Sequence, residues 1–154
     1  QYLKGEVVSK DEFRERYVNS EVYFDRAEPS LIDSRSREVI SEKLDINNWQ
    51  DAKRRNWKLL KSMLNQETYK VVEPETDSCT MFSLVLLLES KEKRDVVRKK
   101  LIESNVYPAI LWNVPYSASK EAKDFSERML SIHCDGRYAE EDIQQLAEIM
   151  NKCL

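Results

Sequence analysis

The sequence predicts an α/β fold in which a small three-stranded sheet, mixed or antiparallel, is covered by helices and preceded by N-terminal helices. Three observations support this prediction. Residues 81–88 form an apolar run of strand length, and residues 129–134 alternate between inward and outward positions. Elsewhere, above all over 49–64 and 140–153, apolar residues recur at the spacing of amphipathic helices.

The length predicts a single domain. A chain of 154 residues can form one hydrophobic core, so we expect one domain over 1–154. Within it, residues 1–66 hold the N-terminal helices, including the long one, and residues 67–154 form a small β-α-β-α-β-α domain. Because the chain begins with Gln1 and not with Met, we expect that an N-terminal portion is missing or has been removed.

Three helices are expected before the first strand. Ser9 with Glu12 forms a capping box that opens a helix over 9–24, and Pro29 ends or follows it. A second helical pattern over 34–44 turns three apolar residues inward: Val39, Ile40 and Leu44. The longest helix runs over 49–64.

The remaining elements alternate between strand and helix. Residues 81–88 are expected to form the central strand, and residues 106–112 a second strand at an edge, because Pro108 cannot donate to a ladder. Residues 129–134 are the third strand, followed by a turn over 135–138. The helices between and after them are expected over 94–104, 122–128 and 140–153.

Composition excludes several classes of protein. The net charge of −3 gives no general attraction to nucleic acid, and the basic run over 91–100 has the pattern of a solvated helix face. No apolar stretch is long enough for a membrane span, and no signal segment opens the chain. With only two glycines, the chain contains no glycine-rich phosphate loop. The three cysteines lack metal-site spacing, which indicates no metal site and a reducing, cytoplasmic location.

Four short motifs stand out in the sequence. The first two lie on expected helices: Arg54, Arg55, Asn56 and Trp57, and Arg94 and Asp95 with Leu101 and Ile102. The other two lie on the expected second strand and the last turn: Val106, Tyr107 and Pro108 with Leu111 and Trp112, and Leu130, Ser131 and Ile132 with Asp135, Gly136, Arg137 and Tyr138. Together they resemble the C-terminal part of aminotransferases of the DegT/StrS type, a fold-type-I family that uses pyridoxal phosphate and acts largely on nucleotide-linked keto-sugars. One departure is His133, which stands where the family usually has proline.

The resemblance implies that this chain is the small C-terminal domain of a pyridoxal-phosphate-dependent aminotransferase that moves an amino group onto a keto-sugar or a similar small carbonyl substrate. The large N-terminal domain of such a parent carries the Schiff-base lysine, so this chain is expected to hold neither catalytic nor cofactor-binding residues and to be inactive alone. The family also implies a homodimer.

In such enzymes the small domain closes over the cofactor cleft and contributes residues that face the substrate. The resemblance makes four residues the candidates for substrate binding: Arg137, Trp112, Asn113 and His133. The planar fork of Arg137 suits a carboxylate or phosphate, although an ion pair with Asp135 is the simpler alternative. The alternative for His133 is a structural residue of the strand with its hydrogen bonds satisfied. The alternative for Trp112 is a side chain packed in the core.

A second hypothesis stays open, in which the chain is a non-catalytic α/β interaction module with the shape of an aminotransferase small domain. Whether the chain belongs to an enzyme is therefore not decided by the sequence. Exposed apolar surface separates the two hypotheses, because a domain cut from its partner leaves an uncovered face. We expect that face near Phe13, Tyr17, Tyr23 and Phe24.

Overall fold

The structure is a computed structural model that describes residues 9–28, 30–76, 79–111 and 114–153. By the contacts within the chain it divides into two compact units, Gln1–Leu44 and Asp45–Leu154.

The first unit consists of helices whose N-termini are capped by their own sequence. In α1 (Lys10–Arg26), the Ser9 hydroxyl accepts a hydrogen bond from the backbone N–H of Glu12 at 3.1 Å. In α2 (Ser34–Glu38), Asp33 accepts one from Ser36 at 2.8 Å, and a π-helical turn, η2 (Val39–Lys43), follows directly. Both helical segments expected before residue 45 are therefore present.

The apolar side chains of the first unit are exposed. The prediction that Val39, Ile40 and Leu44 point inward is wrong, because all three are at least 40% exposed. The physical reason is that none of the described side chains of α2 and η2 is buried, so this part of the chain has no core into which they could pack. The expected uncovered face is present, formed by four exposed side chains of α1: Phe13, Tyr17, Tyr23 and Phe24.

The second unit is built on a three-stranded antiparallel sheet in the order β1-β2-β3. The strands are β1 (Lys70–Val71), β2 (Leu84–Leu87) and β3 (Met129–Ile132). Val71 pairs with Leu86, which pairs with Leu130 on the other side. This confirms the predicted fold class, with the sheet antiparallel and not mixed.

The second strand predicted over 106–112 is wrong. Of the described residues 106–111, only Ala109 joins the sheet, through a single bridge in which its N–H donates to the Ser131 carbonyl at 3.0 Å and its carbonyl accepts from the Ser131 N–H at 2.8 Å; residue 112 lies outside the described residues. Pro108 has no N–H to extend a ladder, which accounts for the short pairing. The sheet instead gains β1, which has only two residues and no apolar run that would mark it in the sequence.

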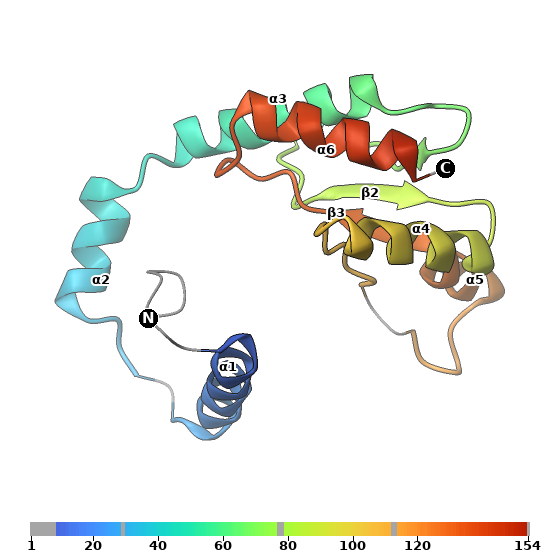
Figure 1. The fold of residues 1–154 in the computed structure, drawn as a ribbon. Coiled ribbons are helices and arrows are strands. Elements are labelled where there is room, and N and C mark those ends of the chain that lie inside the picture. The colour runs from blue at the N-terminus through green and yellow to red at the C-terminus, as the bar shows by residue number, and fades with distance from the viewer. Residues whose placement is uncertain (1–8, 29, 77–78, 112–113, 154) are drawn as a thin grey trace. The chain divides into compact units, whose positions relative to one another are not determined.

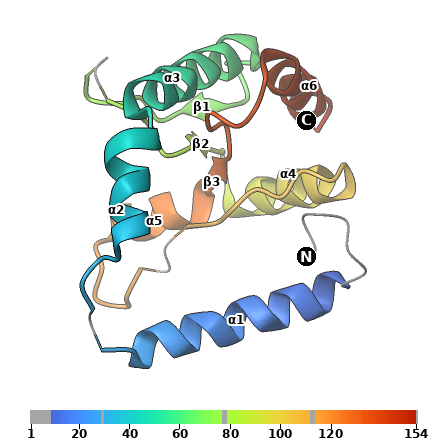
Figure 2. The ribbon, with the colours of Figure 1, turned by 90° about the vertical axis from the view of Figure 1, so that its left-hand side faces the viewer.

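Helices cover both faces of this sheet, as Figures 1 and 2 show. On one face α3 (Ile46–Met63) and α6 (Glu140–Lys152) pack against each other. On the other face lie α4 (Lys91–Glu103) and α5 (Lys120–Arg128). The long helix thus packs with the last helix of the chain, although the sequence grouped it with the N-terminal helices. The expectation of one domain over 1–154 stays a prediction.

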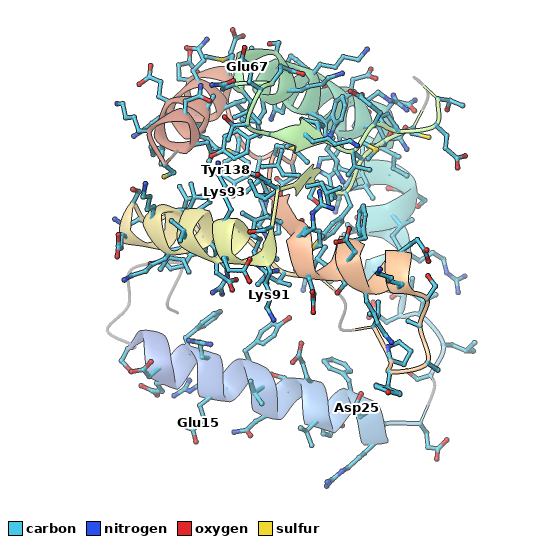
Figure 3. All side chains as sticks on the ribbon, turned by 90° about the vertical axis from the view of Figure 1, so that its right-hand side faces the viewer. Glu15, Asp25, Glu67, Lys91, Lys93 and Tyr138 are labelled. Carbon is cyan, nitrogen blue, oxygen red and sulfur yellow. The ribbon has the colours of Figure 1, made fainter. Side chains whose placement is uncertain are left out.

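The core of the second unit lies between the sheet and its helices. Its largest fully buried side chains include Leu60 of α3, Leu84 and Leu86 of β2, Leu130 of β3 and Met150 of α6. Burying one side chain of this size stabilises the fold by about 1.5–3 kcal/mol. Charged side chains such as Glu67, after α3, and Lys91, on α4, project away from the sheet on opposite sides (Figure 3).

One further property of the helices bears on membrane association. In the described ranges, none of them combines the length and the apolar character that crossing a bilayer requires.

Candidate functional site

The two described candidate residues, His133 and Arg137, lie on the loop between β3 and α6, but only His133 lines the neighbouring groove. The conformation of the loop is set locally, because the Asp135 carboxylate accepts a hydrogen bond from the backbone N–H of Arg137 at 3.0 Å, and the N–H of Tyr138 bonds to the Asp135 carbonyl at 3.3 Å. The carboxylate of Asp142 then accepts from the N–H of Ala139 at 2.9 Å and begins α6. The turn predicted over 135–138 is confirmed.

A close approach to α3 holds the same loop. A Cβ atom on Gly136 would lie 3.0 Å from Cδ1 of Trp49 and 3.3 Å from the Trp49 carbonyl oxygen. The absence of a side chain at Gly136 therefore allows the loop to lie against the helix. This contact links the end of β3 to the first turns of α3.

The side chain of Arg137 is exposed, and its guanidinium group is hydrogen-bonded to Asp135. Its Nε donates to Oδ1 of Asp135 at 2.9 Å and its Nη2 to Oδ2 at 2.7 Å, a bidentate pair. The hydrogen bonds from Arg137 hold the pKa of Asp135 below its ordinary value, and the same pair raises the pKa of Arg137. The fork suits a carboxylate, and in this structure that carboxylate is Asp135.

His133 is exposed and lies directly after β3. Its ring meets Phe82 edge to face, with centroids 6.4 Å apart and an interplanar angle of 73°. The two other candidates, Trp112 and Asn113, lie outside the described residues.

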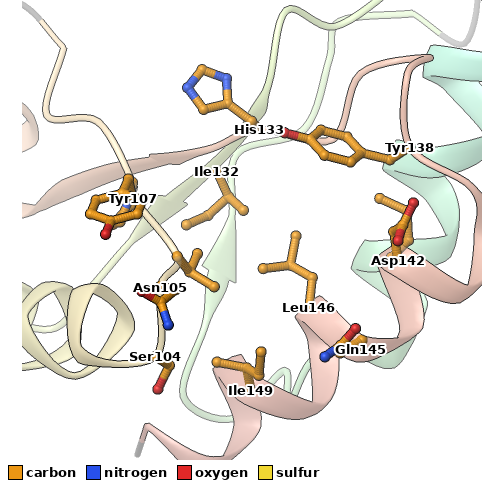
Figure 4. A pocket seen from close by; sticks show the side chains of 13 residues that line it. Ser104, Asn105, Tyr107, Ile132, His133, Tyr138, Asp142, Gln145, Leu146 and Ile149 are labelled. Atoms are coloured by element: carbon orange, nitrogen blue, oxygen red, sulfur yellow. The ribbon is translucent and has the colours of Figure 1, made fainter. Parts of the chain in front are cut away.

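A groove of about 530 Å³ opens beside His133. Three stretches of the chain line it: the segment that follows α4, the end of β3 with the loop after it, and one side of α6. Figure 4 shows Leu146 and Ile149 of α6 on the side across from Tyr107, with the Tyr138 ring extending toward His133. The floor is apolar and the rim carries an imidazole, phenols, a carboxylate and amides, which is the usual composition of a small-molecule site.

Sequence reasoning missed most of this groove. It proposed no binding role for Tyr107, Tyr138, Asp142 or Gln145, all of which line it. No periodicity marks them, because they come from elements that meet only in the folded chain. The Asp142 side chain also has a structural task, since it caps α6.

The described residues do not fit a pyridoxal-phosphate site. Such a site requires a lysine at the aldehyde, a carboxylate at the pyridinium nitrogen and a cradle for the phosphate. Lys53 is the one buried lysine in the described part of the chain, and its ammonium lies over two aromatic rings instead of beside a carboxylate. Likewise, no group of three or more possible metal ligands gathers within the described residues.

Comparison with known proteins finds similarity in structure. No protein-family model matches the chain, and no curated protein matches it in sequence. A protein of Streptococcus pneumoniae described as a sugar aminotransferase matches in its PMP form and in its apo form, each with a TM-score of 0.58 and 10% identity. A 3-amino-5-hydroxybenzoic acid synthase matches with a TM-score of 0.59 and 14% identity.

These matches concern part of each protein. They cover 70% of this chain, but only 31% of the Streptococcus protein and 35% of the synthase. The chain thus spans about a third of the length of the structures that it matches. It has the fold of a part of these enzymes, and this confirms the resemblance at the level of fold.

Proposed function

We propose that this chain is the small C-terminal domain of a pyridoxal-phosphate-dependent aminotransferase of the DegT/StrS type. The parent enzyme transfers an amino group to a keto-sugar or a similar carbonyl compound, and this chain is inactive without the large domain that carries the Schiff-base lysine. The parent is a cytoplasmic homodimer. Pyridoxal phosphate, held by the large domain, supplies the carbonyl that carries the amino group between substrates.

One observation carries the proposal. The fold matches a protein described as a sugar aminotransferase and a 3-amino-5-hydroxybenzoic acid synthase over 70% of this chain and only about a third of theirs, which is the relation expected between one domain and a complete enzyme. The uncovered apolar side chains of α1 agree with it, because a domain separated from its partner exposes the surface that the partner covers.

The β3–α6 loop is the part of this domain that we assign to the substrate. His133 and Arg137 lie on it, and we include Trp112 and Asn113 from the segment after the bridge at Ala109. Arg137 binds an anionic group of the substrate by exchanging it for the Asp135 carboxylate, since both present the same two oxygens to the guanidinium fork.

The test starts with the coding region upstream of Gln1. We expect an open frame for a further large domain, and the complete protein should bind pyridoxal phosphate and transaminate, whereas residues 1–154 alone should do neither. A start codon immediately before Gln1, or a complete protein that does not bind the cofactor, would support the non-catalytic module instead.

The role of Arg137 has its own test in the complete enzyme. We expect Arg137→Gln to raise KM for the carbonyl substrate by about tenfold, since a charge-assisted bidentate pair is lost. Arg55→Gln, an exposed substitution on α3, is the matched control and should leave KM unchanged. An unchanged KM for Arg137→Gln would remove Arg137 from the site.

A further inference from the structure

An aromatic cluster surrounds one lysine at the end of the sheet that carries His133. Trp49 and Lys53 lie one turn apart on α3, and Phe82 lies just before β2. The Lys53 ammonium is 4.6 Å from the centroid of the Trp49 ring and 5.8 Å from that of Phe82. Phe82 in turn meets His133 edge to face. The ammonium therefore lies between two aromatic walls.

Lys53 is buried without a counter-ion. The residue is 9% exposed, and in the described part of the chain it forms neither a hydrogen bond nor an ion pair. Cation–π contacts with Trp49 and Phe82 offset part of the cost of removing the ammonium from water. They do not replace a paired anion, because an unpaired buried charge is costly.

Neighbouring acidic groups do not neutralise Lys53. Both carboxylate oxygens of Asp135 are engaged by Arg137, at 2.9 and 2.7 Å. Burial raises the pKa of the nearby Cys134 thiol to about 11, so the thiol is neutral at physiological pH. The positive charge of Lys53 is therefore available to a ligand.

The ammonium also remains accessible. Among the described residues, the Lys53 ammonium is not one of the fully enclosed polar side-chain atoms that lack a hydrogen-bond partner. It therefore keeps a point of contact with solvent. Its two walls are exposed as well, Trp49 by 48% and Phe82 by 68%.

We propose that Lys53, Trp49 and Phe82 form a binding site for a small ligand that carries an anionic group next to a planar aromatic ring. The anionic group, a carboxylate or a phosphate, pairs with the Lys53 ammonium, and the ring packs against the exposed aromatic walls. This site does not depend on the proposed function, because its three residues are not among those assigned there to the substrate, and their contacts lie within this chain.

The chemistry of the cluster selects this class of ligand. A single cation flanked by two apolar walls gives an inorganic anion few contacts, whereas a ring next to the charge adds buried apolar area. The net charge of −3 provides no general attraction for polyanions. Affinity should come from one ion pair and one aromatic contact together.

The test titrates the full chain with benzoate and with phenyl phosphate, and with acetate and inorganic phosphate as references. Tryptophan fluorescence reports binding through Trp49, and NMR shifts of the His133 ring report it on the other side of Phe82. We expect at least one aromatic anion to saturate both signals, with a Kd about tenfold or more below that of its non-aromatic reference. The two arms separate a carboxylate ligand from a phosphate ligand.

Three variants locate the site. Lys53→Met should weaken binding by about tenfold or more, and Phe82→Ala should reduce the advantage of aromatic over non-aromatic anions. Lys58→Met removes an exposed lysine from the same helix and should leave the Kd unchanged. Phe82 is 68% exposed, so its replacement tests the site without removing a core side chain.

Several results would overturn the proposal. They are the absence of saturable binding by either aromatic anion, equal affinities for aromatic and non-aromatic anions, and unchanged binding by Lys53→Met. Circular dichroism checks that each variant is folded. If Lys53→Met does not fold, Phe82→Ala decides alone, and an unchanged preference for aromatic anions in that variant rejects the site.

Discussion

The side-chain amide of Asn56 in α3 donates a hydrogen bond to the backbone carbonyl of Asp135, at 2.8 Å, across 79 positions of the chain. The same amide donates to the carbonyl of Tyr138 at 2.9 Å. One fully buried side chain thus attaches the loop that carries His133 and Arg137 to the long helix. The position of the candidate site depends on this attachment.

Replacing Asn56 should destabilise the chain. In Asn56→Ala two carbonyl groups lose their donor, which we expect to lower the free energy of unfolding by about 2 kcal/mol. Asn48→Ala, an exposed position on the same helix, should change it by less than about 0.5 kcal/mol. Urea denaturation measures both values, and equal stabilities of the two variants would mean that the attachment contributes nothing.

A side chain at Gly136 should also disturb the loop. In Gly136→Ala the new methyl group would lie 3.0 Å from Trp49 Cδ1 and 3.2 Å from Ala52 Cβ. Because the nearby Trp49 carbonyl belongs to a helix and cannot move aside, we expect a loss of about 1–2 kcal/mol. Thermal denaturation followed by tryptophan fluorescence tests this, and a wild-type midpoint would show that the loop has room for the methyl group.

Because α3 packs against the core, truncating one of its buried side chains should leave a cavity and lower the free energy of unfolding. Leu60 is 0% exposed, and Leu60→Ala should lower the free energy of unfolding by about 2–5 kcal/mol. Leu31 is 95% exposed, and Leu31→Ala makes the same chemical change with an expected effect below about 0.5 kcal/mol. A cost for Leu60→Ala as small as that for Leu31→Ala would contradict the assignment of α3 to the core.

The free energy of unfolding should fall at alkaline pH because the thiol of Cys134 is buried. Burial raises its pKa from 9.0 to about 11, so between these values the unfolded chain loses a proton that the folded chain keeps. The protonated Cys134 thiol makes its full contribution to the free energy of unfolding below about pH 9. This contribution declines as the pH rises toward 11, by about 2–3 kcal/mol in all.

The measurement compares the chain with Cys134→Ala by urea denaturation at several pH values. The variant lacks the thiol, so its free energy of unfolding should fall less steeply over this interval. Burial also raises the pKa of Tyr69, which is present in both proteins and therefore cancels in the comparison. Parallel pH profiles of the two proteins would show that Cys134 does not titrate differently on unfolding.

Local patterns predicted most elements of the fold and the turn that carries Arg137, but of the residues that line the groove they singled out only His133 as a binding candidate. Caps and apolar spacing marked the helices, and the apolar run over 81–88 marked β2. The turn over 135–138, with Arg137 and Asp135 as partners, also follows from residues close together in the sequence. By contrast, β1 has two residues, too few for a pattern, and the segment after α4 contributes one bridge at Ala109.

The sequence by itself determined the helices, strands β2 and β3 and the class of fold, because capping and periodicity act over a few residues. Only the tertiary structure decided that Asn56 holds the β3–α6 loop, that the segment after α4 and α6 enclose a groove, and that Lys53 lies between Trp49 and Phe82. These contacts join residues far apart in the chain. Their geometry depends on how the sheet and its helices pack, which no local pattern encodes.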